Sequence, residues 1–206
     1  TGPYGPAASG PSGAYTISNT NIIPPSNNIA YTGAPYNGYF VEVVGPHPTG
    51  TIAQFTSVKG DPGVSNIPSG VWTFYTNLYN YNQSTGTTST TPVPGPSGYN
   101  KNVTGQIQLS LMDGTGTSYT KIPLGTSRLF NSIGENDPSS AVLLNTAGTS
   151  VNYPSSAYLD VVVNLTSLTP TGTVTQLWTQ GQFVSEVITS LSPPQGPTGP
   201  HGPTGN

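Results

Sequence analysis

Hydrophobic and polar residues alternate along several short segments of the chain. Ile107, Leu109 and Leu111 fall on one face of their segment, and polar residues occupy the positions between them. The segment 159–165 has the same period, with Leu159 and Val163 on one face and Asp160 on the other. A period of two predicts β-strands that bury one face and leave the other to solvent or to a partner.

Turn-forming residues separate the apolar segments, and few windows have room for a helix between the 26 glycines and 22 prolines. Asp113-Gly114 predicts a tight hairpin between two strands. The whole set of predicted strands is Tyr15–Ile23, Gly38–Val44, Thr51–Val58, Val71–Tyr81, Val103–Met112, Ser118–Pro123, Ser127–Ile133, Ala141–Leu144, Ala157–Leu168, Thr173–Gln180 and Phe183–Leu191. So many antiparallel strands in one domain predict an all-β sandwich of jelly-roll type.

The two ends of the chain have a different pattern, in which glycine recurs at every third position. At the C-terminus the spacing holds without interruption, and at the N-terminus it breaks after two glycines; the glycines in question are Gly196, Gly199, Gly202 and Gly205, with Gly2 and Gly5. Gly-X-Y is the repeat of the collagen triple helix, where only glycine fits at the axis. A flexible Pro/Gly linker is the alternative.

These patterns divide the chain into three parts. Residues 1–14 are expected to form a collagen-like arm, 15–192 the β-sandwich and 193–206 a collagen-like tail. Three chains are needed for a triple helix, so the sequence predicts a homotrimer.

Charge is scarce in this chain, at 5% of residues, and the net charge is −3. Soluble domains carry about 25% charged residues. Such a chain has no basic field to attract nucleic acid and no apolar run long enough to insert into a membrane. Uncharged polar surfaces are typical of extracellular fibres and coats, so an extracellular location is expected.

Catalytic chemistry has few candidate residues. Cysteine is absent, and the only histidines are His47 and His201, so neither a histidine-based triad nor a zinc site is expected. Asp160 and Glu186 both lie on predicted strands, and as cross-strand neighbours they would resemble a glycosidase pair. We favour solvated positions for both carboxylates, and we expect no enzyme and no cofactor.

Three further groups of residues are candidate sites. Glu135 and Asp137 share an oxygen-rich loop that is a weak calcium candidate, with ordinary turn chemistry as the simpler explanation. The tyrosines Tyr75, Tyr79 and Tyr81 share one strand face, opposite Trp72, Phe74 and Leu78, and are expected at a subunit interface or stacked on glycan rings. Packing is favoured, because tyrosine is enriched in interfaces. Candidate N-glycosylation sequons begin at Asn82, Asn102 and Asn164.

The segment Ile67–Phe74 resembles a strand opening of the β-sandwich domains that accompany collagen-like repeats in surface proteins of bacteria, spores and large DNA viruses. The hairpin Gln106–Tyr119, the strand Tyr158–Leu165 and the pair Val174–Gln180 and Phe183–Leu191 continue the resemblance. It implies trimeric β-domains on collagen-like stalks that form hairs, fibres or coat decorations.

Collagen-like sequence at both ends departs from the stalk-then-head order of such proteins. The departure favours a subunit within a fibre, or one joined end to end with its copies, on the surface of a cell, a spore or a virion. A carbohydrate-binding adhesin on a collagen-like stalk is the alternative function.

Overall fold

A computed structural model describes residues 14–16, 28–31, 38–60, 64–82, 101–115, 118–133, 139–146, 150–179, 185–189 and 191 of the chain. Every regular element in these residues is a β-strand, and every ladder between strands is antiparallel. The described residues contain no helix that is long and apolar enough to cross a membrane. The prediction of an all-β fold with antiparallel sheets is therefore confirmed.

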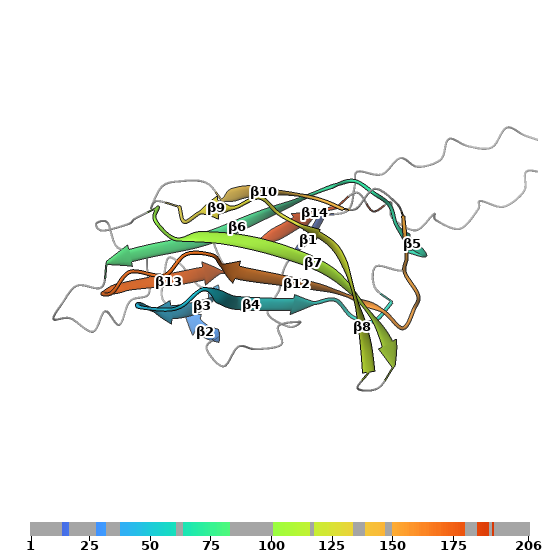
Figure 1. The fold of residues 1–206 in the computed structure, drawn as a ribbon, viewed down its shortest axis with the longest axis horizontal. Helices are drawn as coiled ribbons and strands as arrows, with labels where there is room; N and C mark the ends of the chain where they lie inside the picture. The colour runs from blue at the N-terminus through green and yellow to red at the C-terminus, as the bar shows by residue number, and fades with distance from the viewer. Residues whose placement is uncertain are drawn as a thin grey trace, which may run out of the picture.

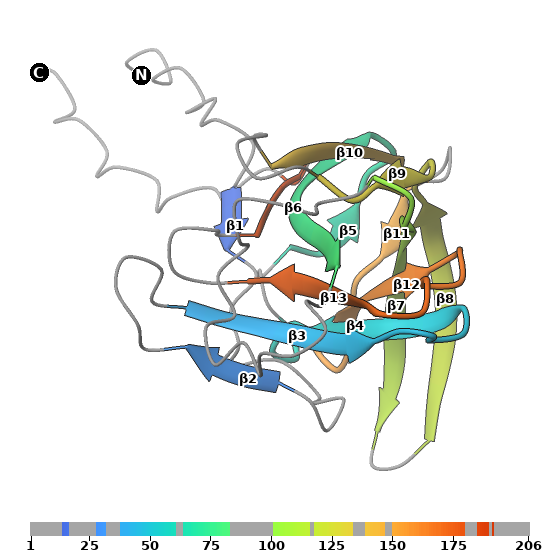
Figure 2. The same cartoon turned by 90° about the vertical axis from the view of Figure 1, so that its left-hand side faces the viewer.

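The strands form two large sheets, which lie over one another as two layers (Figures 1 and 2). The first sheet has the order β1-β14-β6-β13-β3-β2, with β10 on the free edge of β6. Its strands are β1 (Ala14–Thr16), β14 (Glu186–Ile188), β6 (Val71–Asn82), β13 (Thr173–Trp178), β3 (Gly38–Val44), β2 (Asn28–Tyr31) and β10 (Ser140–Asn145).

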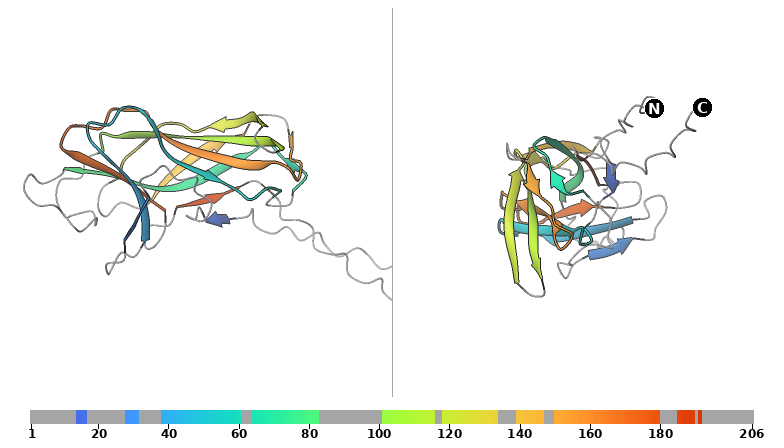
Figure 3. Two further views of the ribbon diagram at one scale, coloured as in Figure 1. Left: turned by 90° about the horizontal axis from the view of Figure 1, so that it is seen from below. Right: turned by 90° about the vertical axis from the view of Figure 1, so that its right-hand side faces the viewer.

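The second large sheet has the order β4-β12-β7-β8, with β9 on the edge of β7. Its strands are β4 (Gly50–Thr56), β12 (Tyr158–Leu165), β7 (Thr104–Thr115), β8 (Ser118–Thr126) and β9 (Phe130–Asn131). A small third sheet pairs β5 (Asn66–Ile67) with β11 (Val151–Asn152). The views from below and from the opposite end show the two large layers edge-on (Figure 3).

The chain crosses repeatedly between the two large sheets. It passes directly from one to the other between β3 and β4, β6 and β7, β9 and β10, and β12 and β13. It also changes layer from β4 to β6 and from β10 to β12, by way of the small third sheet. The connection from β7 to β8 stays within one sheet, as a hairpin. This hairpin turns later than predicted, because β7 continues through Gly114 to Thr115, which pairs with Ser118.

The main core lies between the inner faces of the two sheets, where the period-two pattern predicted it. Trp72, Phe74 and Leu78 of β6 face Ile107 and its neighbours of the second sheet in one buried cluster. Burying a large apolar side chain stabilises a fold by about 1.5–3 kcal/mol, so these alternating positions are a main source of stability. Leu191, three residues beyond β14, is also a member of this cluster and is 1% exposed.

Several element boundaries differ from the prediction. The segment Ser127–Ile133 was expected to be one strand, but only Phe130 and Asn131 form it. At Ser127 the backbone amide still donates to the carbonyl of Ile107 at 2.8 Å, but the amide of Ile107 donates to the Ser127 side-chain Oγ at 2.9 Å. The strands β2, β5 and β11 were not predicted, since segments of two to four residues are too short to show an alternation.

Candidate functional site

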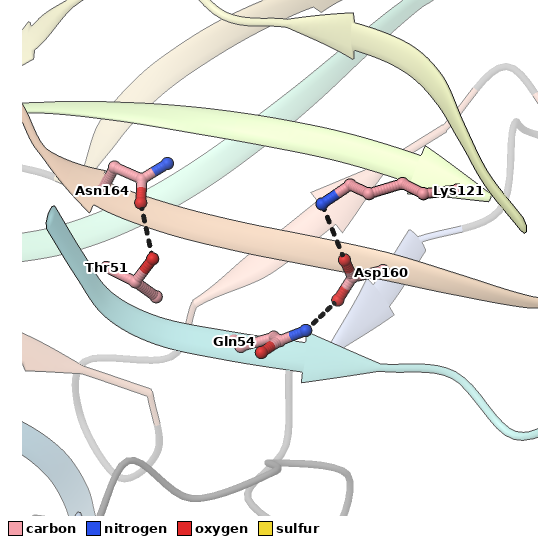
Figure 4. A network of polar contacts seen from close by, with 5 residues as sticks. All are labelled: Thr51, Gln54, Lys121, Asp160 and Asn164. Carbon is pink, nitrogen blue, oxygen red and sulfur yellow. Dashed lines mark hydrogen bonds and ion pairs between the residues drawn. The ribbon is translucent and has the colours of Figure 1, made fainter. Parts of the chain in front are cut away.

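The outer face of the second sheet carries a network of polar side chains (Figure 4). We call it the polar face; it comprises Thr51, Gln54, Lys121, Asp160 and Asn164. Asp160 lies in the middle of β12, between Thr56 and Ser110 on the neighbouring strands, and is 1% exposed. A carboxylate this deeply buried needs partners, and they come from the adjacent strand β4 and from β8, which lies on the far side of β7.

Two side chains satisfy the Asp160 carboxylate. Gln54 Nε2 donates a hydrogen bond to Oδ1 at 2.6 Å, and Lys121 Nζ forms an ion pair with Oδ2 at 3.5 Å. The Lys121 side chain is 49% exposed, so its ammonium keeps contact with water while its stem lies over the sheet. Four residues further along β12, Asn164 Oδ1 accepts a hydrogen bond from Thr51 Oγ1 at 2.8 Å. The five side chains of the polar face therefore form hydrogen bonds or ion pairs with one another.

Asp160 and Glu186 are not cross-strand neighbours, and the solvated position that was favoured for Asp160 is wrong, because this residue is buried. Asp160 lies on β12 in the second sheet, whereas Glu186 lies on β14 in the first sheet, where it is paired with Tyr75 and with Thr16. Both residues do lie on strands, but strand order places them in different layers. A two-carboxylate arrangement for glycoside hydrolysis is thus not formed by these two residues.

The outer face of the first sheet has two unlike halves. In the half built by β13, β3 and the second part of β6, the aromatic side chains of Phe40, Tyr79 and Trp178 are buried with Ile133 in a second cluster. The rings of Phe40 and Trp178 lie 4.7 Å apart between centroids. We call this region the covered half.

A buried glutamine organises the polar groups of the covered half. Gln176 has 0% exposure, and its Nε2 donates to Glu42 Oε2 at 2.7 Å and to the Tyr81 hydroxyl at 3.1 Å. Its Oε1 accepts a hydrogen bond from Trp178 Nε1 at 3.0 Å. Each polar atom of this amide therefore has a partner, as a buried amide requires.

The pKa of Tyr81 is raised to about 12 in this setting. Burial is the largest cause, the negative charge of Glu42 is the second, and the hydrogen bond from Gln176 acts in the opposite direction. The phenol is therefore held protonated, which makes it a poor general base at neutral pH.

The other half of the outer face lies on β10, the first part of β6 and β14, and we call it the open half. Cross-strand register aligns its side chains in two rows, Leu143–Thr73–Ile188 and Ala141–Tyr75–Glu186, with Val71 opposite Asn145 at one end. Leu143 is 56% exposed and Val71 is 51% exposed. The only charged side chain in these rows is that of Glu186.

The three tyrosines that were expected at a subunit interface or a glycan site therefore have different environments. Tyr79 is 1% exposed and packs within its own chain, which leaves it no surface to offer a glycan or a second subunit. Tyr81 is partly buried and hydrogen-bonded to Gln176. Tyr75 is partly exposed on β6, the central strand of the open half, between Ala141 and Glu186. Trp72, Phe74 and Leu78 lie in the core, as their alternation predicted.

A further aromatic pair, which sequence analysis missed, lies beside the β7–β8 hairpin. The rings of Tyr119 and Tyr158 are 5.4 Å apart at 73°, and Lys59 Nζ lies 5.1 Å from the Tyr119 ring centroid. Burial raises the pKa of Tyr158, with Tyr119 and Asp160 adding smaller effects. Rings at this angle do not form the flat platform on which a sugar ring stacks.

The sequons differ in accessibility. Asn82 and Asn102 are exposed, whereas Asn164 is partly buried with its Oδ1 bonded to Thr51. His47 lies between β3 and β4 in an isolated antiparallel bridge with Thr169. Its amide donates to Thr169 Oγ1 at 2.8 Å, and its Nδ1 lies 2.8 Å from the carbonyl of Pro48. These contacts are those of a structural loop histidine.

The collagen-like glycines and the calcium candidate lie outside the described residues. This applies to Gly2, Gly5, Gly196, Gly199, Gly202 and Gly205, and to Glu135 and Asp137. Within the residues that are described, no three His, Asp or Glu side chains gather closely enough to hold a metal ion. No known protein family, curated protein or solved structure matches this chain.

Leu143 and Gln176 were missed by sequence analysis for different reasons. The run Ala141-Val142-Leu143-Leu144 is apolar at every position, which is the signal of a strand with two apolar faces. Gln176 gives no such signal. It shares a strand face with Val174 and Trp178, and a polar residue in that position is also typical of a half-exposed strand.

Proposed function

We propose that this chain is a structural, non-enzymatic subunit of an extracellular fibre or surface decoration on a cell, spore or virion. It trimerises through its collagen-like segments and its β-domain. The observation that carries the proposal is the unbroken Gly-X-Y spacing from Gly196 to Gly205, which begins five residues after Leu191, a residue anchored in the core. A triple helix of that length is short, so it needs a folded domain to hold its three chains together.

We further propose that the β-domain is a jelly roll. The strand orders β3-β13-β6-β10 and β4-β12-β7-β8 support this, together with the alternation of the chain between the two layers. Two interlocked Greek keys produce such orders, and the fold is common in coat and lectin domains.

The few ionisable side chains in the described residues also favour a structural role. Asp160 is engaged by Gln54 and Lys121, and Tyr81 is held protonated. His47 is engaged by its own loop. None of these groups is poised as a nucleophile with an adjacent base.

The pairing of β1 with β14 bears on how the domain sits in a fibre. Ala14, where the N-terminal arm ends, is opposite Ile188, near the start of the C-terminal tail. Both collagen-like segments are therefore attached at the same end of the domain. In the proposed fibre the domain stands beside the axis, while the arm of one subunit meets the tail of the next.

The test is the mass of the full chain in solution together with its appearance in electron micrographs. Light scattering at low micromolar concentration is expected to give a trimer or a multiple of three. Micrographs are expected to show domains projecting from thin filaments. A stable monomer or dimer would contradict the proposal.

The second candidate is a carbohydrate-binding adhesin, and the observation in its favour is the partly exposed Tyr75 on the apolar open half. Binding to a glycan panel that is lost in Tyr75→Ala would support it. We rank it second, because Tyr119 and Tyr158, which are partly exposed and in ring contact, are not coplanar.

A further inference from the structure

The open half is an exposed apolar surface with little charge. Leu143 on β10 and Val71 on β6 are each more than half exposed and are diagonal neighbours across the two strands. Ile188 lies in the same row as Leu143, on the far side of Thr73, and Tyr75 lies in the next row. Single exposed apolar residues are ordinary, but a contiguous group on a sheet face indicates an interaction site. Tyrosine is enriched in interfaces, and Tyr75 lies at one side of this group of aliphatic side chains.

The position of the C-terminal tail identifies the partner that would cover this surface. Leu191 is fixed in the core of each subunit, and the first tail glycine, Gly196, is five residues further on. A fully extended chain of that length spans about 17 Å. If Gly196 lies at the axis of a triple helix, each Leu191 lies within about 17 Å of that axis.

Three domains that meet this condition are held close together. Any two Leu191 residues lie within about 34 Å of each other, which is less than the diameter of about 40 Å of a domain of this length. The ends of the domains that carry Leu191 are therefore held at high effective concentration around the axis. The open half is close to this end, because β14 leads directly into Leu191 and contributes Ile188 to the surface.

We propose that the open half is the surface on which a second copy of this chain packs in the trimer. This inference rests on the proposed trimer and names its contact surface. The surface suits a homo-oligomer, because Glu186 is the only charged side chain in its rows and identical copies do not repel one another strongly. The covered half is not proposed as the contact surface, because its aromatic side chains are already buried within one chain.

Leu143→Glu in the full chain tests the proposal. The side chain of Leu143 is 56% exposed in the single chain, so the variant is expected to fold, which circular dichroism checks. A carboxylate in the packed interface is expected to raise the concentration at which trimers dissociate by at least about tenfold. Leu168→Glu is the matched control, because Leu168 is 62% exposed and lies outside the open half.

Thiol labelling provides a second measurement that disturbs the surface less. The chain has no cysteine, so Leu143→Cys and Leu168→Cys each create a single reactive site. In the trimer, alkylation by a maleimide is expected to be at least about tenfold slower at position 143 than at position 168. Dilution below the dissociation concentration is expected to remove the difference.

Each outcome has one meaning. Weaker trimers in Leu143→Glu and slow labelling at position 143 support the proposal that the open half is the trimer contact surface. If Leu143→Glu leaves the trimer unchanged and the two labelling rates are equal, the open half is not the contact surface. The proposed trimer is then unaffected. Loss of glycan binding in Leu143→Glu without a change in mass overturns it as well and assigns the open half to a glycan. A monomeric wild-type chain overturns both the trimer and the surface.

Discussion

Ala14 in β1 is the cross-strand partner of Ile188 in β14, although 174 positions separate them in the sequence (188 − 14). This pairing places Ala14, the last residue of the N-terminal Gly-X-Y segment, opposite Ile188, which precedes the C-terminal one, at one edge of the first sheet. A fibre in which the β-domain lies in line with its stalks needs attachment at opposite ends. The observed pairing instead favours a domain that stands beside the axis.

A disulfide between these two positions tests the pairing. In Ala14→Cys/Ile188→Cys, directly opposed strand positions are within the range of Cα separations that a disulfide spans. We expect the oxidised variant to form an intramolecular disulfide, seen by mass spectrometry, and to gain about 2–4 kcal/mol in free energy of unfolding.

The control for this disulfide is Ala14→Cys/Glu186→Cys. Glu186 is opposite Thr16, two residues out of register with Ala14, so its disulfide is expected to form slowly or not at all. Equal oxidation of both variants would contradict the register.

Local patterns predicted the inward faces of the long strands but not the pairing between distant ones. Ile107, Leu109 and Leu111 lie in the core because alternation alone specifies one buried face. Which edge receives β1, or which sheet receives Asp160, depends on strand order, and no local pattern encodes it.

The environment of Tyr79 shows the same limit at the level of one side chain. Alternation placed Tyr79 correctly on the face opposite the core. Its burial depends on Phe40 and Ile133, which come from distant segments and form a second cluster on that outer face. A strand pattern assigns a residue to a face, but it does not show what covers the face.

Alkaline pH is expected to destabilise the domain through Tyr81. Its pKa is raised from 10.0 to about 12, mainly by burial and then by the charge of Glu42. The folded state keeps a proton that the unfolded chain releases, so this contribution is complete below about pH 10 and is lost as the pH rises to about 12. We expect a loss of about 1–2 kcal/mol, reduced from the full effect because the side chain is partly exposed.

Urea unfolding at pH 9 and pH 11.5 measures this loss, and Tyr81→Phe is the control. The hydroxyl is absent in that variant, so its stability is expected to fall less over the same interval. Spectrophotometric titration is also expected to show one fewer late-titrating tyrosine in Tyr81→Phe. A Glu42→Gln variant should move the pKa of Tyr81 part of the way back, because it removes the second cause of the shift.

The buried carboxylate of Asp160 is expected to depend on Lys121. Lys121→Met removes the only cation that pairs with Asp160 in the structure and leaves the carboxylate with the hydrogen bond from Gln54. We expect a loss of about 1–3 kcal/mol in the free energy of unfolding, because a buried charge loses part of its compensation.

The double variant Lys121→Met/Asp160→Asn separates charge burial from packing. An asparagine is nearly the same shape, and its side-chain oxygen still accepts from Gln54. The double variant is therefore expected to recover at least half of the stability that Lys121→Met loses, as measured by chemical denaturation. A double variant less stable than Lys121→Met alone would show that the ion pair is not the relevant interaction.

Removal of divalent cations is expected to leave the unfolding midpoint unchanged. The scarcity of histidine and the lack of cysteine give the chain few ligands for a structural metal. Thermal unfolding with and without a strong chelator measures the effect. A large drop with chelator, abolished in Asp137→Asn, would instead assign a calcium site to the loop that contains Glu135 and Asp137.

The C-terminal tail is expected to form a triple helix only with support from the β-domains. Eleven residues from Gly196 to Asn206 make about 34 Å of helix at roughly 3.1 Å each. Ordering a chain costs about 1–2 kcal/mol per residue, and so short a helix has few interchain contacts to offset that cost. Three β-domains that hold the tails at high effective concentration lower the cost.

Gly199→Val tests this dependence, because a side chain at the axis disrupts a triple helix. We expect filaments in electron micrographs to shorten or disappear and the assembly to lose heat resistance, while circular dichroism of the β-domain stays unchanged. Thr198→Val is the matched control: it places the same side chain one position away, where the repeat tolerates any residue. If both variants assemble like the wild type, the tail is a linker, because only a triple helix distinguishes position 199 from position 198.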